Sequence, residues 1–441
     1  MRKHPEDGFP DAEESPLRFR KFQYNTKAFI GDVFGGVIAA LIALPYGLAM
    51  ATLMGLPPVM GLFTSLLTTP ITFLLGRNPV LIGGTSTVTV PFMAKAVADY
   101  GIGGAAKIAL IASMFMMVFS VLRWGRYILQ VPHAVVSGFS CGIGAMMVIA
   151  QLKTIFGLAI PANSAQMSAV EQFWLVLMKI GGFHWQPFVL GVVVIGAAFA
   201  VAGYNKTLPA PLIGVLLSVA VSYTLGLHEK EVGRLPIDLP PLASFVWSPT
   251  DIDKLLIPGF GLAFVASINI LITSRVVEHF RGKHHRPLRP SDADAELGAY
   301  GIANICAGMF GAPLSVGIPA RSLANVRCGG TTRLSNLFHG IALFACLWAG
   351  AEYVSKIPIA ALAGVTAYVG ICLLEWSTWR RLLKMRRVDS LAFLSTCGLV
   401  LVTNAVIAVA IGCGFYGVQW LKHRYWDEQA SREATLQRSA S

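Results

Sequence analysis

The 441-residue sequence contains little charge, because Asp, Glu, Lys and Arg make up only 13% of it. A soluble domain carries about a quarter of charged residues, so this composition excludes an ordinary soluble enzyme. It also excludes a disordered chain, which needs high charge and low hydrophobicity, since 55% of the residues here are hydrophobic. The composition therefore indicates a protein that lies mostly in a membrane.

Residue types that bind metals or carry out chemistry are also sparse. The seven cysteines stand singly, mostly within apolar runs, and form no CxxC pair, so no disulfide framework and no metal or redox centre is predicted. The apolar runs contain no pair of carboxylates, no zinc-ligand cluster and no nucleophile with its base. We therefore expect no enzyme activity and no cofactor. Residues 1–27 are polar and contain no apolar core of a secretory signal peptide.

Acidic residues are missing from the middle of every apolar run. A proton-coupled carrier normally keeps a titratable carboxylate or histidine at its binding site. Their absence favours exchange or uniport over proton symport. The acids nearest to the apolar runs lie close to the predicted ends; they are Asp32, Glu171, Asp294, Glu296, Glu352 and Glu375.

The sequence has instead about fourteen apolar stretches that can form membrane-spanning helices. No polar segment is large enough for a soluble domain, so the predicted fold is an all-α polytopic membrane protein. The last stretch is long enough for two short helices with a break near Asn404. The stretches are Phe29–Leu53, Val59–Leu75, Val80–Val97, Ile108–Leu122, Ala134–Leu152, Glu171–Ile180, Phe188–Val201, Ala210–Leu225, Pro258–Thr273, Leu297–Phe310, Leu314–Cys328, Leu334–Ala349, Ile357–Leu374 and Leu391–Leu421.

Basic residues set the predicted orientation. Lys and Arg, 35 together against 23 Asp and Glu, collect in the cytoplasmic loops of membrane proteins. With fourteen spans and the N-terminus inside, most of them fall on the cytoplasmic side, so the net charge of +12 indicates topology and not nucleic-acid binding. We expect a multi-pass membrane protein with both ends on the cytoplasmic side. Its parts would be a cytoplasmic tail (1–28), a transmembrane transport domain (29–421) and a second cytoplasmic tail (422–441).

The predicted transport domain divides into two halves. The longest non-helical stretch, Leu227–Ile257, contains four prolines and separates residues 29–227 from residues 258–421. Pro79–Gly83 in the first half resembles Pro313–Gly317 in the second. Because seven spans are an odd number, the halves would insert in opposite directions, which predicts a seven-plus-seven inverted repeat.

Spans 3 and 10 contain these Pro and Gly segments and predict an anion site. In each, a short strand would precede a broken half-helix, whose N-terminal N–H groups are free. A helix N-terminus carries about half a positive charge and favours anions. The first half-helix would begin near Thr85, Ser86 and Thr87, whose hydroxyls can cap it or donate to a ligand, and the second near Pro319 and Ala320.

Arg321 is a positive charge within a span, where an ionisable side chain costs several kcal/mol and is usually functional or paired. It follows the predicted start of the second half-helix, so its N–H groups would hold an oxyanion. In the alternative interpretation, Arg321 extends its charged end to cytoplasmic water, because the span ends soon after, at Cys328.

Several motifs of the sequence follow a known pattern. They are Ala43–Ala51, Gly55–Leu62, Glu296–Ile305, Gly308–Gly311, Ala320–Ser322 and Asn325. These motifs resemble those of the sulfate permease (SulP) family, bacterial relatives of the animal solute-carrier anion exchangers. The resemblance covers nearly the whole chain, from Phe29 to about Leu421. It implies a mobile core domain, a gate domain, a homodimer and a place in the bacterial inner membrane, in addition to the inverted repeat.

Several positions depart from the family pattern. Tyr46 stands where the family has a substrate-contacting Gln, and Met50 where it has an aromatic residue. Gly83-Gly84 replaces a Gly-Pro pair. Asn269 replaces a Glu that is associated with proton coupling, and Asn cannot carry a proton. Only about twenty residues follow Leu421, so we expect the cytoplasmic regulatory (STAS) domain of the family to be absent or supplied by a separate protein.

The sequence thus predicts a secondary transporter of a small inorganic or organic oxyanion, such as sulfate or bicarbonate, that works by elevator-type alternating access. Two alternatives stay open: a nucleobase permease of the same fold and a channel-like anion uniporter. The nucleobase carriers bind their ring with carboxylates at the positions where this chain has Asn269 and Arg321. The predicted substrate-binding residues are Tyr46, Met50, Thr85, Ser86, Thr87, Ala320 and Arg321, with Asn269 at the coupling position.

Overall fold

The computed structural model describes residues 26–128, 131–160, 167–205, 208–227, 229–233, 249–284, 291–403 and 407–420. Within this part of the chain, seven helices are long and apolar enough to cross a membrane, and four further apolar helices are shorter. The architecture is therefore mostly helical, with several apolar helices of membrane-spanning length. Almost all of the predicted tails, 1–28 and 422–441, and the predicted break near Asn404 lie outside the described residues.

The first half of the chain begins with two apolar helices, each interrupted by a proline. α1 (Thr26–Leu53) contains Pro45, and α2 (Met60–Leu75) contains Pro70. Hydroxyls along α2 bond to carbonyl oxygens of its preceding turn, which satisfies them in an apolar setting. The elements that follow are β1 (Gly83–Thr85), the 3₁₀ turn η1 (Thr87–Thr89), α3 (Val90–Val121), α4 (Gly125–Ile128), α5 (His133–Ile155), α6 (Ala169–Met178), the 3₁₀ turn η3 (Ile180–Gly182), α7 (Trp185–Tyr204) and α8 (Ala210–Thr224).

The second half of the chain has the same kinds of element, including a second short strand before a short helix. α10 and α13 match the predicted stretches Leu297–Phe310 and Ile357–Leu374 within a few residues at each end, whereas α9 extends well beyond Pro258–Thr273 at both ends. Its elements are α9 (Pro249–His284), α10 (Ala293–Met309), β2 (Ser315–Gly317), α11 (Pro319–Arg327), α12 (Leu334–Ser355), α13 (Ile359–Cys372), α14 (Trp376–Arg381), the 3₁₀ turn η4 (Leu382–Lys384) and α15 (Arg387–Val402), with a last helix at Ile407–Trp420.

The predicted boundary between two spans falls on a break within α3. The stretches Val80–Val97 and Ile108–Leu122 are predicted as separate helices, and α3, from Val90 to Val121, consists of two helical segments that meet at a kink between them. Gly101 interrupts α3 with a non-helical conformation (φ 70°, ψ −179°), a positive φ that glycine adopts without steric cost. The break between the two predicted spans is therefore a kink at one glycine.

The two short strands pair with each other in the interior of the molecule. β1 and β2 are antiparallel, with Gly83 opposite Gly317 and Thr85 opposite Ser315, and all six residues are buried. Asn304 of α10 extends the pairing, because its side chain accepts from the Ser315 N–H (2.7 Å) and donates to the Ser315 carbonyl (2.8 Å). The two Pro and Gly segments that resemble each other in the sequence thus lie side by side.

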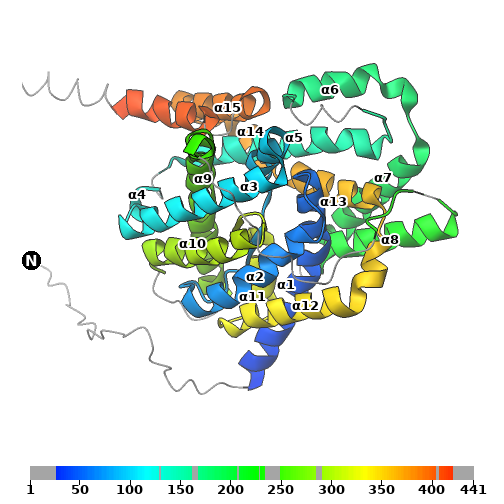
Figure 1. The fold of residues 1–441 in the computed structure, drawn as a ribbon, viewed down its shortest axis with the longest axis horizontal. Coiled ribbons are helices and arrows are strands. Elements are labelled where there is room, and N and C mark those ends of the chain that lie inside the picture. The colour runs from blue at the N-terminus through cyan, green and yellow to red at the C-terminus, as the bar shows by residue number, and fades with distance from the viewer. Residues whose placement is uncertain are drawn as a thin grey trace, which may run out of the picture.

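The helices, drawn in Figure 1, form two packed groups. In the first group, α1, α2, α3 and α9–α12 surround the two strands; α3 packs on α10, and α1 on α12. In the second group, α5, α7, α8, α13 and α15 pack on one another. Contacts between the groups run mainly through α1, which touches α8 and α13.

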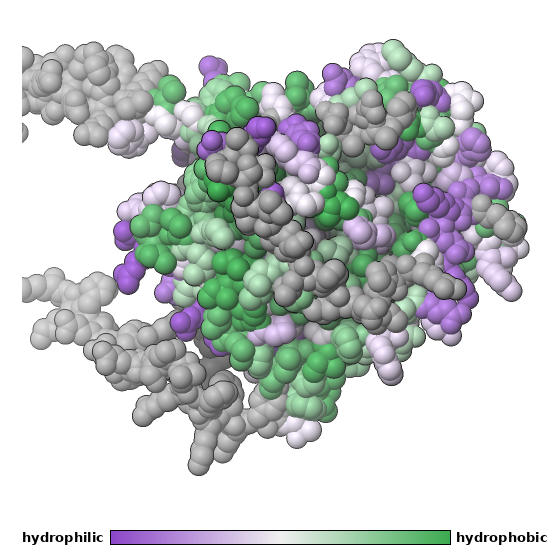
Figure 2. All heavy atoms as spheres, in the orientation of Figure 1, coloured by the Kyte–Doolittle hydropathy of each residue, from purple (hydrophilic) through white to green (hydrophobic). Residues whose placement is uncertain are grey.

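The surface of the molecule carries many large apolar side chains. Trp348 and Phe344 of α12, for example, are 67% and 55% exposed. Figure 2 shows hydrophobic residues over much of one face, with hydrophilic residues gathered along its right-hand edge. Such a surface is suited to lipid tails and would not suit water. All seven cysteines are free thiols.

Candidate anion-binding site

Two helices begin directly after the paired strands. η1, which leads into α3, begins at Thr87 behind an extended Ser86 (φ −124°, ψ 153°). α11 begins at Pro319 behind an extended Ile318. We call Ser86–Thr87 the first break and Pro319–Ala320 the second break. Because β1 and β2 are paired, both breaks leave the same two-stranded sheet.

The second break offers free backbone donors. No side chain caps α11, and no hydrogen bond joins the N–H of Ala320 or Arg321 to any residue that the structure describes. Unpaired N–H groups are expected in the first turn of a helix, where an anion can satisfy them. Pro319 and Ala320 are exposed, so this helix end is accessible.

Arg321, two residues after the start of α11, is completely buried. Its Nη1 donates to Ser65 Oγ of α2 (3.1 Å), its Nη2 points to the Ala43 carbonyl of α1 (3.5 Å), and its Nε has no partner among the described residues. None of the ion pairs within the described ranges involves Arg321. The interpretation in which the guanidinium reaches cytoplasmic water is therefore wrong for this structure. The Arg321 guanidinium is instead a buried positive charge that has no carboxylate partner among the described residues.

Tyr46 connects the two breaks. Its hydroxyl accepts a hydrogen bond from the Thr87 N–H (3.3 Å), and its ring lies 5.1 Å from the Arg321 guanidinium carbon. A guanidinium at this distance from an aromatic face is attracted to the ring. The residue that replaces the Gln of the family pattern thus contacts both halves of the site.

The first break has fewer groups available than the sequence suggests. The Thr85 hydroxyl, predicted as a donor to a ligand, donates to the Gly61 carbonyl of α2 (3.0 Å). The Ser86 hydroxyl caps its own turn by accepting from the Val88 N–H at 3.5 Å. Thr85, Ser86 and Thr87 are all buried, unlike Ala320 at the second break.

Two other predicted residues lie on the helices that flank the strands. Met50 is fully buried on α1, one turn after Tyr46. Asn269 lies on α9, which packs against β2, and its buried Oδ1 has no partner among the described residues. The structure places Tyr46, Thr87 and Arg321 together, with Met50 a neighbour of Tyr46 on α1. No hydrogen bond that joins Asn269 to these residues is identified in the described ranges.

Sequence reasoning missed the groups that hold Arg321. Ser65 accepts its hydrogen bond, and Gly84 makes room for it, because a Cβ at Gly84 would meet both Arg321 Nη1 and Ser65 Oγ. A usable signal was present in α2, where hydroxyl residues recur every three or four positions and so line a face of the helix. They are Thr64, Ser65, Thr68, Thr69 and Thr72.

A cavity of about 480 Å³ opens between the two helix groups. Ala49 of α1 and Val90 of α3 line one side of the cavity; each follows a site residue, Tyr46 or Thr87, within one turn. Helices α5, α13 and α15 supply most of the other side. Lys95, paired with Asp99 (3.0 Å), and Lys153 also line it. The cavity lies between the groups, and Tyr46, Thr87, Ala320 and Arg321 are not among its lining residues.

Comparison with known proteins agrees with the resemblance of the motifs. A family model described as the sulfate permease family matches residues 29–396. The chain is 28% identical over 399 residues to the bicarbonate transporter BicA of Picosynechococcus sp., an alignment that covers 87% of this chain and 68% of that protein. It is 30% identical over 414 residues to a probable sulfate transporter of Mycobacterium tuberculosis, covering 91% of this chain and 70% of that one.

The fold is similar to solved structures of membrane transporters. The transmembrane domain of a cyanobacterium bicarbonate transporter, BicA, matches with a TM-score of 0.78 at 25% identity, covering 88% of this chain and 98% of that one. The structure of SLC26A9 matches with a TM-score of 0.80 at 20% identity, covering 90% of this chain and 66% of that one. At 20% identity, the likeness to SLC26A9 concerns the fold alone.

Proposed function

Because the chain belongs to the sulfate permease family of membrane anion transporters, we propose that it is a secondary transporter of a small oxyanion of the sulfate or bicarbonate class. The observation that carries this proposal is the buried guanidinium of Arg321, which has no carboxylate partner among the residues that the structure describes. A buried charge is costly unless it is paired and hydrogen-bonded. An oxyanion beside Arg321 would supply the missing negative charge.

The anion would bind between the two breaks. The N–H groups of Ala320 and Arg321 are donors without a protein partner in the described ranges, and the α11 dipole adds a partial positive charge. The Thr87 N–H would become a third donor if the Tyr46 hydroxyl moved or shared it. The predicted contacts from Met50, Thr85 and Ser86 would shape the pocket more than they bind the anion.

Alternating access would come from movement between the two helix groups. Contacts within each group are dense, contacts between them run mainly through α1, and the cavity lies on the border. Elevator-type transport needs one group to carry the site past the other as a rigid body. The fourteen spans in two inverted halves, the cytoplasmic termini, the bacterial inner membrane and the homodimer belong to this proposal and rest on the sequence.

Transport would be exchange or uniport. Asn269 stands where a coupling carboxylate would be needed, and its amide cannot carry a proton. Uptake into proteoliposomes with and without an imposed pH gradient tests this point. Strong acceleration by an inward proton gradient would contradict it, and the variant N269E would be expected to create a dependence on the gradient.

A flux panel tests the function itself. Purified protein in proteoliposomes would be given labelled sulfate, bicarbonate, nitrate, chloride, a dicarboxylate and uracil. We expect saturable uptake of an oxyanion and none of uracil. Uptake of uracil alone would replace the proposal by a nucleobase permease, and non-saturating anion flux would replace it by a channel.

A further inference from the structure

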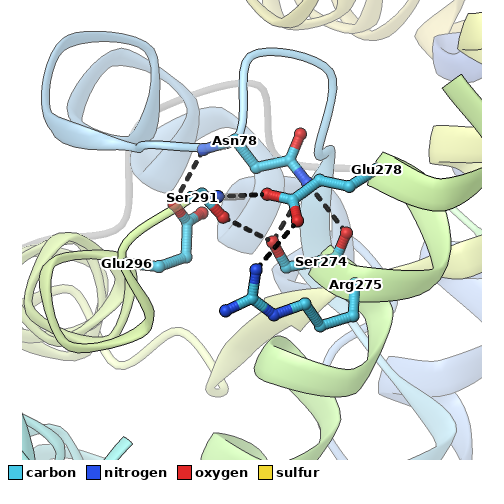
Figure 3. A network of polar contacts seen from close by, with 6 residues as sticks. All are labelled: Asn78, Ser274, Arg275, Glu278, Ser291 and Glu296. Atoms are coloured by element: carbon cyan, nitrogen blue, oxygen red, sulfur yellow. Dashed lines mark hydrogen bonds and ion pairs between the residues drawn. The ribbon is translucent and has the colours of Figure 1, made fainter. Parts of the chain in front are cut away.

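A network of polar groups joins the segment after α2 to α9 and α10 (Figure 3). The chain passes through this network on its way to β1 and the first break. None of the network residues belongs to the proposed anion site. They are Asn78, Ser274, Arg275, Glu278, Ser291 and Glu296.

Glu296, near the start of α10, is a buried carboxylate with only 1% of its surface exposed. Its Oε2 accepts hydrogen bonds from the backbone N–H groups of Arg77 (2.5 Å) and Asn78 (2.9 Å). None of the ion pairs in the described part of the chain includes Glu296. Its direct partners are therefore two backbone donors of the turn that follows α2.

Asn78 fixes the same turn from the other side. Its Nδ2 donates to Ser274 Oγ (3.0 Å) and to the Ser274 carbonyl (3.1 Å), and its Oδ1 accepts from the Val80 N–H (3.2 Å). Ser274 Oγ lies 3.2 Å from Ser291 Oγ, and the Ser291 N–H donates to Glu278 (2.8 Å). The turn is thus tied to α9 and to the segment before α10 as well as to Glu296.

The residues after Asn78 lead straight to the first break. The Ile82 N–H donates to Ser322 Oγ (2.9 Å), and the Ile82 carbonyl accepts from the Ile318 N–H (3.0 Å). β1 follows at Gly83, and Ser86 comes directly after β1. A shift of the turn at Arg77 and Asn78 would therefore be passed to β1 and to the Thr87 donor.

We propose that Glu296 is a positioning residue for anion transport: its carboxylate fixes the turn at Arg77 and Asn78 and thereby places the first break opposite the second. This role rests on the proposed function. It depends on the oxygen as a hydrogen-bond acceptor and not on the charge, because both N–H groups bond to the same Oε2. An amide oxygen at that place can accept both.

The variants E296Q and E296A separate the acceptor from the charge. In proteoliposome uptake of the best-transported anion of the panel, we expect E296Q to keep KM within about twofold of wild type. We expect E296A to raise KM about tenfold with a smaller change in maximal rate, because two buried donors lose their acceptor and the turn shifts. An imposed pH gradient should change the rate of anion uptake by E296Q and by wild type equally.

The matched control is E171A. Glu171 also accepts a backbone N–H with its carboxylate, from Ser168 at 2.7 Å, but it caps α6, which packs on α5 of the second helix group. The E171A substitution should lower the melting temperature without changing the KM for anion uptake. If E296A does not fold, N78A takes its place, since it releases the same turn and should raise KM likewise.

Three outcomes overturn the role. E296Q with the KM of E296A would show that the charge is what matters. E296A or N78A with the wild-type KM would show that the turn does not control the site. A lost response to the pH gradient in E296Q would make Glu296 a proton carrier. If the wild type transports no anion of the panel, the proposed function fails, and the result is distinguishable from these three.

Discussion

The break after β1 and the break after β2 leave the same small sheet but present different groups to an anion. The first break is buried, its Thr87 N–H is bonded to Tyr46, and its Ser86 hydroxyl caps the turn, while the hydroxyl of the preceding Thr85 bonds to α2. The second break is exposed at Ala320, has no cap and is followed by Arg321. Binding strength should therefore come mainly from the second break, while the first adjusts it.

Removal of the guanidinium should have the largest effect. R321A removes the one buried charge of the second break, and we expect anion uptake to fall about 10- to 100-fold, the range for lost charged hydrogen bonds. The melting temperature should hold or rise, because burial of a charge without a protein partner is costly. Uptake and thermal unfolding of the same preparation measure both effects.

The control for this change is R327A. Arg327 lies on the same helix and is exposed, with its guanidinium carbon 5.1 Å from the Phe280 ring. Uptake by R327A should equal that of wild type. Unchanged uptake in R321A would mean that the first break binds the anion by itself.

A methyl group at Gly84 should have the next largest effect. Gly84 lies in β1, the strand before the first break, but a methyl group there would displace Arg321 of the second break. A Cβ there would meet Arg321 Nη1 and Ser65 Oγ, so the guanidinium must move. We expect G84A to raise the KM for anion uptake about tenfold, the consequence of a lost charged hydrogen bond. G196A is the control, since a Cβ at Gly196 of α7 has no neighbour within 4 Å. A wild-type KM in G84A would show that the position of the guanidinium is not critical.

The Tyr46 hydroxyl tests the first break alone. Y46F keeps the ring beside Arg321 and frees the Thr87 N–H. Because the anion then gains a donor without competition, we expect its KM to fall about two- to fivefold, within the net value of one hydrogen bond. The melting temperature should fall without the anion and recover when the anion is added.

Y300F is the control for this prediction. The Tyr300 hydroxyl is also buried, but it has no partner among the described residues. Its removal should change neither KM nor the effect of the anion on unfolding. A raised KM in Y46F would mean that the hydroxyl itself binds the anion.

The contrast between the breaks explains what could be predicted from the sequence. The repeated Pro and Gly segments indicated both breaks and their strands, because such residues interrupt a span visibly. Arg321 was evident as a charge within an apolar stretch. Its partner Ser65 was not, because 256 positions separate the two residues and only the fold brings them together. For the same reason, nothing in the sequence showed that the Thr85 hydroxyl would bond to the Gly61 carbonyl.

Glu296 is a further example of this limit. From its place near the end of an apolar stretch it resembles an ordinary residue of the membrane surface. Its function in the structure depends on two backbone donors more than 200 positions earlier in the chain. Backbone partners have no side-chain signature, so a sequence pattern cannot reveal them.

The smallest effect is expected at Ser86, and it measures how much the first break contributes. The Ser86 hydroxyl accepts from the Val88 N–H at 3.5 Å, the outer limit of a hydrogen bond, so S86A should change the anion KM less than about twofold. S168A is the control: Ser168 caps α6 in a reciprocal pair with Glu171 and should lower the melting temperature while KM is unchanged. If S86A instead raised KM as much as G84A does, the hydroxyl of the first break would be a direct ligand of the anion. The two breaks would then bind it as equals, in spite of their different exposure.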